Sequence, residues 1–296
     1  EKPEGTETTE ETETKATDVS KVILITDSEY QVVSIDQSIP LPDYVFYPNS
    51  DTDKTAVEWT VDDLNVAEVA TTTDANVKVS GTVKAKAAGV AVVKLQVVGK
   101  TEVNAAFRLI VRPTNEPKNC KADATYNSVS LSWSPVADAN GYTITRKVEG
   151  SDTEQTIAHV DGTDTVSYKD TAAQTGISYI YHVYAYTKYT NNGQTDYANT
   201  DAYASVKATP QLGKAAMTSV TAEGYSSLTL KWEKVDGATG YIVYRSTDKS
   251  KVDTQLTDIT NGAVSYVDAA LTAGTTYYYK AVSYTHLRAH ETRGNL

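Results

Sequence analysis

Hydrophobic and polar residues alternate in short runs along most of this chain, and Gly, Asp, Asn or Pro separates the runs. Between residues 21 and 112 the runs include VILIT, AVEWTV and VAVVKLQVVG. A period of two places apolar side chains on one face of a strand, and runs this short are typical of strands rather than helices. Pro113 cannot continue a central strand, so it marks a domain boundary. The pattern predicts an all-β protein.

The rest of the chain contains an internal repeat. Ser128–Arg146, SVSLSWSPVADANGYTITR, matches Ser227–Arg245, SLTLKWEKVDGATGYIVYR. Trp133 and Trp232 occupy the same place in the two units. A period of about 100 residues is typical of one β-sandwich domain per unit. The alternating apolar positions of each unit predict the inward rows of a two-sheet core: Val129, Leu131, Trp133, Tyr142 and Ile144, and then Leu228, Leu230, Trp232, Tyr241 and Val243.

The segment before Pro113 resembles the bacterial immunoglobulin-like group 2 (BIG2) domain. The resemblance covers most of residues 21–112. It rests on a Trp in an early strand, a VA-x-V step and a G-x-V-x-A-x-x-x-G pattern, here Trp59, Val66, Ala67, Val69, Gly81, Val83, Ala85 and Gly89. We expect Trp59 to be the large anchor of the core. Gly81 and Gly89 are expected to allow tight turns.

Both later units resemble the fibronectin type III module. The motifs that carry the resemblance are L-x-W, then G-Y-x-[IV]-x-R, then G-x-x-Y-x-Y. The first Tyr of the last motif, Tyr179 or Tyr277, matches the tyrosine-corner position of that family. The two resemblances imply three immunoglobulin-like or fibronectin-like β-sandwich domains in series.

The last residues, VSYTHLRAHETRGNL (Val282–Leu296), are unlike the rest of the chain. His286 and His290 have a metal-like spacing, with Glu291 beside the second. The stretch resembles the conceptual translation of a transposon-based sequencing adapter, in a frame that fits from Ala281 onward. The resemblance implies that this tail is not native, that its histidines have no role, and that the last domain is truncated. The first residues of the tail still continue the alternation, so a strand can run into them.

These observations divide the chain into five segments. Residues 1–19 are a Thr/Glu-rich linker, expected to be disordered because it has almost no apolar surface to bury. Residues 20–113 form the BIG2-like domain, and residues 114–210 form the first fibronectin-like domain. Residues 211–281 form an incomplete second one, and residues 282–296 are the adapter-like tail.

Charge and composition narrow the functional classes. The formal net charge of −11 argues against nucleic acid and anionic membrane surfaces as partners. No apolar run approaches the roughly 20 residues of a membrane-spanning helix, so no membrane insertion is expected. The single cysteine, Cys120, cannot form an internal disulfide and is expected to be a half-buried strand residue without a role.

Candidate chemistry is sparse. Outside the tail the only histidines are His159 and His182, and His182 has the outward parity of its strand. No nucleophile motif, phosphate loop or Cys/His pair is present. The acidic pairs at Asp62/Asp63, Asp51/Asp53 and Asp161/Asp164 have no calcium-loop pattern and are expected to be solvated turns. We therefore predict no catalytic, cofactor-binding or metal-ligating residues, and no enzyme within this fragment.

Tyrosine is abundant, with 21 residues against two Phe, and several cluster late in the first repeat unit near Tyr203. The candidate surface contacts are Tyr184, Tyr186, Tyr189 and Tyr197. Exposed tyrosines can stack on sugar rings or pack on peptide partners. An ordinary sandwich surface is the alternative. Asn192–Gly193 predicts a hairpin turn in this region.

The resemblances imply a location outside the cytoplasm, since in bacteria such modules are mostly extracytoplasmic. We expect a monomeric, non-catalytic fragment of a bacterial secreted or cell-surface protein that acts as a spacer, in adhesion or in ligand presentation. Its expected partners are cell-wall or host glycans or proteins. Accessory modules of a secreted polysaccharide- or peptidoglycan-degrading enzyme, with its catalytic domain outside this fragment, are the alternative. The module types disfavour an intracellular partner-binding protein.

Overall fold

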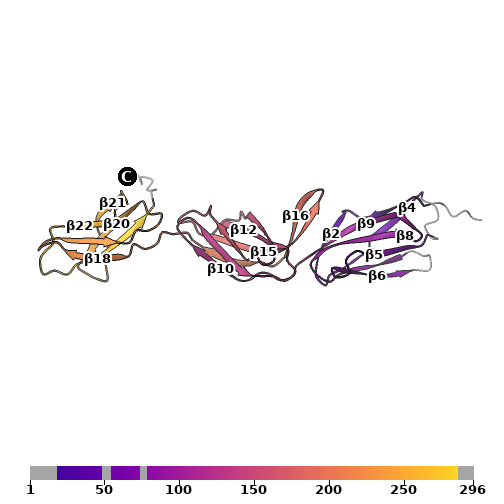
Figure 1. The fold of residues 1–296 in the computed structure, drawn as a ribbon, viewed down its shortest axis with the longest axis horizontal. Coiled ribbons are helices and arrows are strands. Elements are labelled where there is room, and N and C mark those ends of the chain that lie inside the picture. The colour runs from indigo at the N-terminus through magenta and orange to yellow at the C-terminus, as the bar shows by residue number, and fades with distance from the viewer. Residues whose placement is uncertain (1–18, 49–54, 74–78, 286–296) are drawn as a thin grey trace, which may run out of the picture.

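The computed structural model describes residues 19–48, 55–73 and 79–285. All the regular secondary structure in these ranges is β-strand. The strands form three sandwich units that follow one another along the chain (Figure 1). The prediction of an all-β fold with β-sandwiches in series is confirmed. Almost all of the predicted linker, and the tail from residue 286, lie outside the described residues. No helix in the described ranges could span a membrane.

Within the described residues, the first unit has nine strands in three sheets. The sheets are β1–β4, β2–β9–β8–β5 and β3–β7–β6, and β2 runs parallel to β9. The strands are β1 (Lys21–Ile25), β2 (Tyr30–Ser34), β3 (Ser38–Pro40), β4 (Asp43–Tyr47), β5 (Val57–Val61), β6 (Ala67–Thr73), β7 (Val79–Ala85), β8 (Gly89–Val97) and β9 (Lys100–Arg112).

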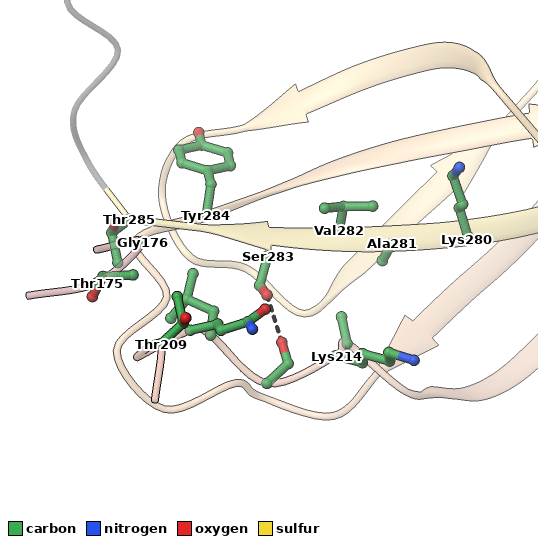
Figure 2. A pocket seen from close by; sticks show the side chains of 14 residues that line it. Thr175, Gly176, Thr209, Lys214, Lys280, Ala281, Val282, Ser283, Tyr284 and Thr285 are labelled. Carbon is green, nitrogen blue, oxygen red and sulfur yellow. Dashed lines mark hydrogen bonds between the residues drawn. The ribbon is translucent and has the colours of Figure 1, made fainter. Parts of the chain in front are cut away.

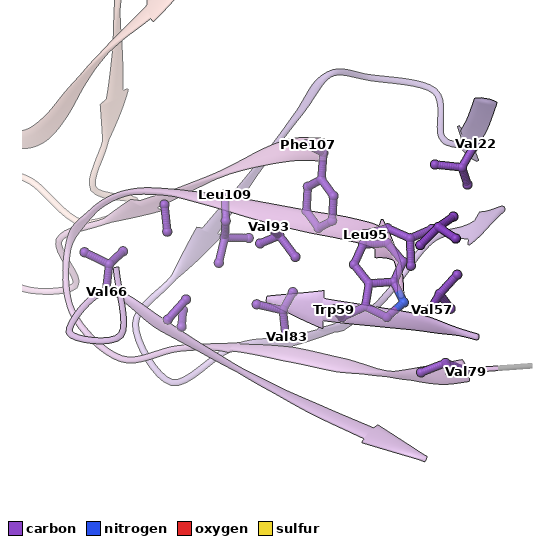
Figure 3. Close-up of a cluster of buried hydrophobic side chains, with 14 of the residues drawn as sticks. Val22, Val57, Trp59, Val66, Val79, Val83, Val93, Leu95, Phe107 and Leu109 are labelled. Carbon is purple, nitrogen blue, oxygen red and sulfur yellow. The ribbon is translucent and has the colours of Figure 1, made fainter. Parts of the chain in front are cut away.

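One hydrophobic core joins these three sheets, and Trp59 is its largest side chain (Figure 3). The indole packs edge-on against Phe107 and Tyr44, with ring centroids 6.5 Å away in both cases. Gly81 does not form a turn as expected but lies within β7. A Cβ there would stand 2.1 Å from the carbonyl oxygen of Ala70, so glycine is needed for strand contact.

The second unit contains two sheets that face each other across a separate core. One is β10–β11–β14. In the other, β13, β12, β15 and β16 follow one another, and β17 also pairs with β15. The strands are β10 (Lys118–Ala124), β11 (Val129–Ser134), β12 (Gly141–Val148), β13 (Gln155–Asp161), β14 (Ser167–Asp170), β15 (Tyr179–Asn191), β16 (Gln194–Asn199) and β17 (Ala204–Ala208).

As far as residue 285, the third unit repeats this plan with fewer strands. Its two sheets are β18–β19–β22 and β21–β20–β23. The strands are β18 (Met217–Ala222), β19 (Leu228–Trp232), β20 (Gly240–Ser246), β21 (Thr254–Ile259), β22 (Ser265–Asp268) and β23 (Tyr278–Tyr284). Strand β23 corresponds to β15 and includes the first three residues of the adapter-like tail.

The predicted inward rows are buried in both repeat units, except that Leu228 is only half-buried. Each Trp contacts a Tyr from the opposite sheet. The ring centroids of Trp133 and Tyr142 are 5.2 Å apart, and those of Trp232 and Tyr241 are 5.5 Å apart. Each of these tyrosines also uses its hydroxyl. It accepts a 2.8 Å hydrogen bond from the backbone N–H of the residue six positions earlier. The aromatic pair therefore fixes both the packing and the path of the preceding loop.

An Arg–Asp–Tyr cluster around a buried carboxylate joins the two sheets of each repeat unit. In the second unit, Arg146 donates to Asp170 at 2.7 Å, and the hydroxyl of Tyr181 donates to the same carboxylate at 2.8 Å. Burial raises the pKa of Tyr181, and its bond to Asp170 raises it further. The charged pair is thus satisfied by hydrogen bonds, as a buried carboxylate requires. The third unit repeats the cluster with Arg245, Asp268 and Tyr279.

The tyrosine-corner contact is present in both units. The hydroxyl of Tyr179 accepts a hydrogen bond from the backbone N–H of Gln174 at 3.3 Å. The hydroxyl of Tyr277 accepts one from Thr272 at 3.2 Å. In each case the partner lies five residues upstream, which is the contact expected from the motif. The guanidinium of the cluster arginine covers each ring, 4.9 Å from Tyr179 in the second unit.

Candidate functional site

The outer face of the β13–β12–β15 sheet points away from the core of the second unit and carries both of the described histidines. Residues paired across antiparallel strands point to the same side. His159, Thr143 and Tyr184 therefore form one row across the three strands. Thr145 and His182 form the next row. This surface combines aromatic, imidazole and hydroxyl side chains where a sandwich usually presents charged ones.

We name four rings on this surface the aromatic face: Tyr184, His159, Tyr197 and Tyr203. Tyr203 is 43% exposed and lies just before β17, with its ring centroid 5.0 Å from that of Tyr184. The ring of Tyr197, from β16, stacks on His159 with centroids 3.7 Å apart and 5° between the planes. Such rings combine an apolar face with a polar edge, so they can contact a sugar ring or a peptide.

His182 lies beneath this face rather than on it. Its side chain points outward, as the parity predicted, but it is only 7% exposed because Tyr203 covers it at a centroid distance of 4.2 Å. Its Nδ1 lies 2.8 Å from Oε1 of Glu154. The hydroxyl of Thr145 donates to the same oxygen. Burial opposes ionisation of Glu154, but these two contacts outweigh it and lower the pKa of this carboxyl.

The surroundings also set the protonation of two rings of the aromatic face, the half-buried Tyr184 and the exposed His159. Burial, with a further contribution from the charge of Glu154, raises the pKa of Tyr184 to about 12. Tyr184 therefore stays a neutral phenol that can donate a hydrogen bond at physiological pH. Burial lowers the pKa of His159, although the charges of Asp161 and Asp196 oppose the shift. The imidazole that stacks on Tyr197 is accordingly favoured in its neutral form.

Tyr186 is fully buried, so the prediction of a surface contact is wrong for this residue. The residue opposite it on β12 is Gly141, and the ring lies across this glycine: a Cβ there would stand 2.5 Å from the Tyr186 hydroxyl oxygen. The hydroxyl donates to Oδ1 of Asp161 at 2.6 Å. Tyr197 packs edge-on against the ring at 4.8 Å. Tyr186 points to the outer face, as the alternation predicts, but it is not exposed, because Gly141 leaves space for the ring to lie flat on the sheet.

Tyr189 makes a contact, but within the chain. It is 9% exposed and lies at the junction with the first unit, where it joins a small apolar cluster with Ile110 and Ala198. Its ring centroid is 5.5 Å from that of Tyr30 in β2. Of the four predicted tyrosines, Tyr184 and Tyr197 are thus the half-buried ones on the outer face of the sheet. The predicted hairpin turn at Asn192–Gly193 is confirmed, with both residues at positive φ.

The sequence held no signal for Glu154. It belongs to the loop before β13 and reaches His182 only through the register of three strands. Tyr30 was equally hidden, because its contact with Tyr189 crosses between two units. His159 was visible as a histidine, but its stacking on Tyr197 depends on how the β15–β16 hairpin folds back over the sheet.

The remaining candidates are structural. Burial raises the pKa of the half-buried Cys120 thiol, which makes it less reactive. Asp62 accepts a 2.7 Å hydrogen bond from the backbone of Val92, and Asp63 accepts one from Asn65 within its own turn. Asp51 and Asp53 lie outside the described residues, as do the tail histidines. Among the described residues, no group of three His, Cys, Asp or Glu side chains could hold a metal ion.

Comparison with known proteins returns similar folds and no family. No protein-family model matches this chain, and no curated protein matches it. Among solved structures, it is similar to a segment of two fibronectin type III domains from chicken tenascin, with 18% identity, coverage of 58% of this chain and 93% of that chain, and a TM-score of 0.36. It is also similar to the FN1–FN3 domains of chicken CNTN1, with 13% identity, coverage of 90% and 92%, and a TM-score of 0.29.

The lowered pKa of Glu154 predicts a specific acid sensitivity of the second unit. A carboxyl with a depressed folded-state pKa stabilises the fold above its unfolded value of 4.5, and this contribution is lost as the pH falls through the folded value. Glu154→Gln should therefore destabilise the second unit near neutral pH. The difference from the parent protein should shrink below about pH 4. Denaturant unfolding followed by Trp fluorescence across this range measures both.

Asp152→Asn is the matched control, because Asp152 lies in the same loop and is exposed. This control should track the parent protein at every pH. A Glu154→Gln variant with a pH-independent deficit would contradict the assignment.

Proposed function

We propose that this chain is a non-catalytic, modular segment of a bacterial secreted or cell-surface protein, with a BIG2-type domain followed by two fibronectin type III domains. Its role is that of a spacer that also presents a ligand-binding surface. The location is supported by the resemblances of the BIG2-like and fibronectin-like motifs. The single observation that carries the spacer role is the packed junction between the first and second units.

This junction is more than a linker. Apolar contacts come from Tyr189 and Ala198 of the second unit, which pack on Ile110 of β9 together with Tyr30 and Val90. Ile110 is fully buried, although it belongs to the face of β9 opposite the core of the first unit. A residue on the outside of one sandwich is thus buried only because the next sandwich covers it. Such shared burial favours one relative orientation of the two units.

Polar contacts reinforce the same orientation. The hydroxyl of Thr187 is fully buried and donates to the backbone carbonyl of Val111 at 2.7 Å. Arg112 of β9 pairs with Asp201, and Arg108 donates to the backbone carbonyl of Thr190. In Figure 1 the hairpin of β15 and β16 leans toward the first unit beside β2. Hydrogen bonds and ion pairs depend on direction, so they restrict the relative orientation of the two units more than the apolar contact does alone.

The aromatic face supports the ligand-presenting part of the proposal. Its rings lie on one sheet of the middle unit, and the polar groups of Glu154 and Asn199 lie beside them. Sugar rings bind to proteins through aromatic faces and neighbouring hydrogen-bonding groups, a combination that this surface offers. We therefore propose neutral glycans of a cell wall or host surface as its ligands.

The tail enters the proposal as a non-native extension. We propose that residues 282–296 derive from sequencing-adapter DNA and that the third domain continues differently in its source. DNA reads that cover the codon of Ala281 should depart from the adapter sequence directly after it and encode another apolar-alternating strand. The same tail, found as protein in independent genomes, would refute this.

The junction predicts a fixed distance between the first two units. Spin labels at Glu58→Cys and Lys169→Cys, in a Cys120→Ser background, should give one narrow distance distribution in pulsed electron resonance. Tyr189→Ala should broaden it, because the ring that buries Ile110 is lost. Tyr225→Ala, which removes a 97% exposed ring in the third unit, should leave it narrow. A distribution as broad in the parent protein as in Tyr189→Ala would exclude a rigid spacer.

The aromatic face predicts a loss of glycan retention on mutation. In pull-downs with insoluble cell-wall polysaccharides, the parent chain should be retained. Tyr184→Ala and Tyr203→Ala should reduce retention by about fivefold each, because each removes a stacking ring that contributes roughly 1 kcal/mol. Tyr225→Ala should bind like the parent. If no polysaccharide retains the parent chain, the glycan ligand is wrong and the spacer role stands alone.

A further inference from the structure

The aromatic face contains a chain of hydrogen bonds that is centred on Thr143 of β12. Thr143 is only 1% exposed, and its hydroxyl donates to Oδ1 of Asn199 at 2.7 Å. The same hydroxyl oxygen lies 3.0 Å from Nδ1 of His159. The three side chains come from β12, β16 and β13, so the fold brings together residues that are far apart in the sequence. A buried hydroxyl with two partners fixes the orientation of both.

The single hydrogen of the Thr143 hydroxyl determines the direction of both bonds. The amide oxygen of Asn199 can only accept, so Thr143 donates to it and must accept at its other contact. Nδ1 of His159 therefore carries the hydrogen in that contact. Burial lowers the pKa of His159 and favours the neutral imidazole, in which Nε2 is then an acceptor without a hydrogen. The amide nitrogen of Asn199 is correspondingly left as a donor.

The remaining acceptor and donor lie at the surface. In the part of the chain that the structure describes, no group forms a hydrogen bond with Nε2 of His159 or Nδ2 of Asn199. His159 is exposed, and Asn199 is half-buried. Tyr197 stacks on the imidazole with ring centroids 3.7 Å apart, so an aromatic surface lies beside the two polar groups. The face thus presents one acceptor and one donor in fixed orientations next to a pair of stacked rings.

The repeat shows that the fold does not require this chain of hydrogen bonds. The pair Thr143 and His159 on β12 and β13 corresponds to Ile242 and Asp258 on β20 and β21 of the third unit. Ile242 is 5% exposed, so an aliphatic side chain fits the place that Thr143 occupies. The polar arrangement therefore belongs to the surface of the second unit and not to the scaffold that the two units share.

A hollow of about 930 Å³ beside the third unit is the alternative place for a ligand (Figure 2). It is lined by β23, by the linking segment Gln211–Ala215 between the second and third units, and by the end of the second unit. Part of its wall is Val282–Thr285, which belongs to the adapter-like tail, and Ser283 donates there to the carbonyl of Gly213 at 2.8 Å. We therefore assign no ligand to this hollow.

We propose that the aromatic face binds a polysaccharide through its N-acetylated amino sugars, an inference that rests on the glycan-binding role proposed above. An acetamido group holds one N–H and one carbonyl in a rigid plane. The N–H donates to Nε2 of His159, and the carbonyl accepts from Nδ2 of Asn199, while the apolar face of the sugar packs on the neighbouring rings. Two rigid pairs of groups lose less entropy on binding than freely rotating hydroxyls do.

Hydrogen bonding and charge distinguish this sugar from the charged alternatives. A deacetylated amino sugar carries an ammonium group, which can only donate and so leaves the Asn199 amide without an acceptor. An acidic sugar brings a carboxylate, which cannot donate to Nε2 of His159. The charges of Asp161 and Asp196 near this imidazole, and the net charge of −11, also repel it. The neutral acetamido group satisfies both positions without either penalty.

The test compares β-1,4-linked oligomers of N-acetylglucosamine, glucose and glucosamine, all of one length, by titration calorimetry with the full chain at physiological salt. The N-acetylglucosamine oligomer should bind about tenfold more tightly than the glucose oligomer, because it completes two further hydrogen bonds. It should also bind more tightly than the glucosamine oligomer, which measures attraction by charge alone. Equal binding of the N-acetylglucosamine and glucose oligomers would overturn this inference and leave the glycan-binding role intact. No binding of any oligomer or polysaccharide would overturn both.

Variants of the chain assign the preference to these side chains. Thr143→Val removes the hydroxyl that orients His159 and Asn199, so the two oligomers should bind about equally. Thr143→Ser keeps the hydroxyl and should keep the preference. His159→Phe retains a ring beside Tyr197 and should lower only the affinity for the N-acetylglucosamine oligomer. Thermal unfolding checks that each variant is folded. A preference that survives Thr143→Val or His159→Phe would contradict the assignment.

Discussion

Strand β15 imposes the constraint on which most of this molecule depends, because its side chains must alternate between two faces over its whole length. One row, from Tyr179 to Ala185, fills the core of the second unit, and the same row continues through Thr187 and Tyr189 into the junction with the first unit. The opposite row carries His182, Tyr184 and Tyr186 on the outer face. One strand thus sets the packing of a domain, its orientation to its neighbour and the position of the aromatic face.

The sequence predicts the row that faces the core far better than the row that faces outward. Trp133 and Tyr142 could be assigned to the core because the sequence shows both the apolar alternation and the repeated unit. In the structure the two side chains are buried and in contact. Tyr186 could not, because its burial depends on Gly141 in a neighbouring strand. The contact of Tyr189 with Tyr30 depends on the register between two units, which no local pattern encodes. The position of a residue in a strand determines the face to which its side chain points, but the neighbouring side chains determine whether it is exposed.

The repeat shows which interactions the two later units retain when many other residues differ. Both keep the buried carboxylate that receives an arginine and a tyrosine hydroxyl, Asp170 in one and Asp268 in the other. Removing one member of such a cluster leaves a buried charge without its partner, so the members tend to persist together. The outer face follows no such rule, and the position of His182 is Lys280 in the third unit. The scaffold is thus repeated, whereas the surface of each unit is individual.

The corresponding strands β15 and β23 differ in length, and this difference accounts for the different contacts that their units make. The second unit extends β15 to Asn191 and returns through β16, which creates the surface that covers Ile110 of the first unit. It also closes the other edge of its sheet with β17. In the third unit, β23 ends at Tyr284, and the linking segment covers only one end of its edge, through Ala215. Tyr277 and Tyr279 are accordingly half-buried, whereas the corresponding Tyr179 and Tyr181 are buried. The extra length of β15 therefore lets one strand serve two purposes, the core of its own unit and the contact with the neighbouring unit.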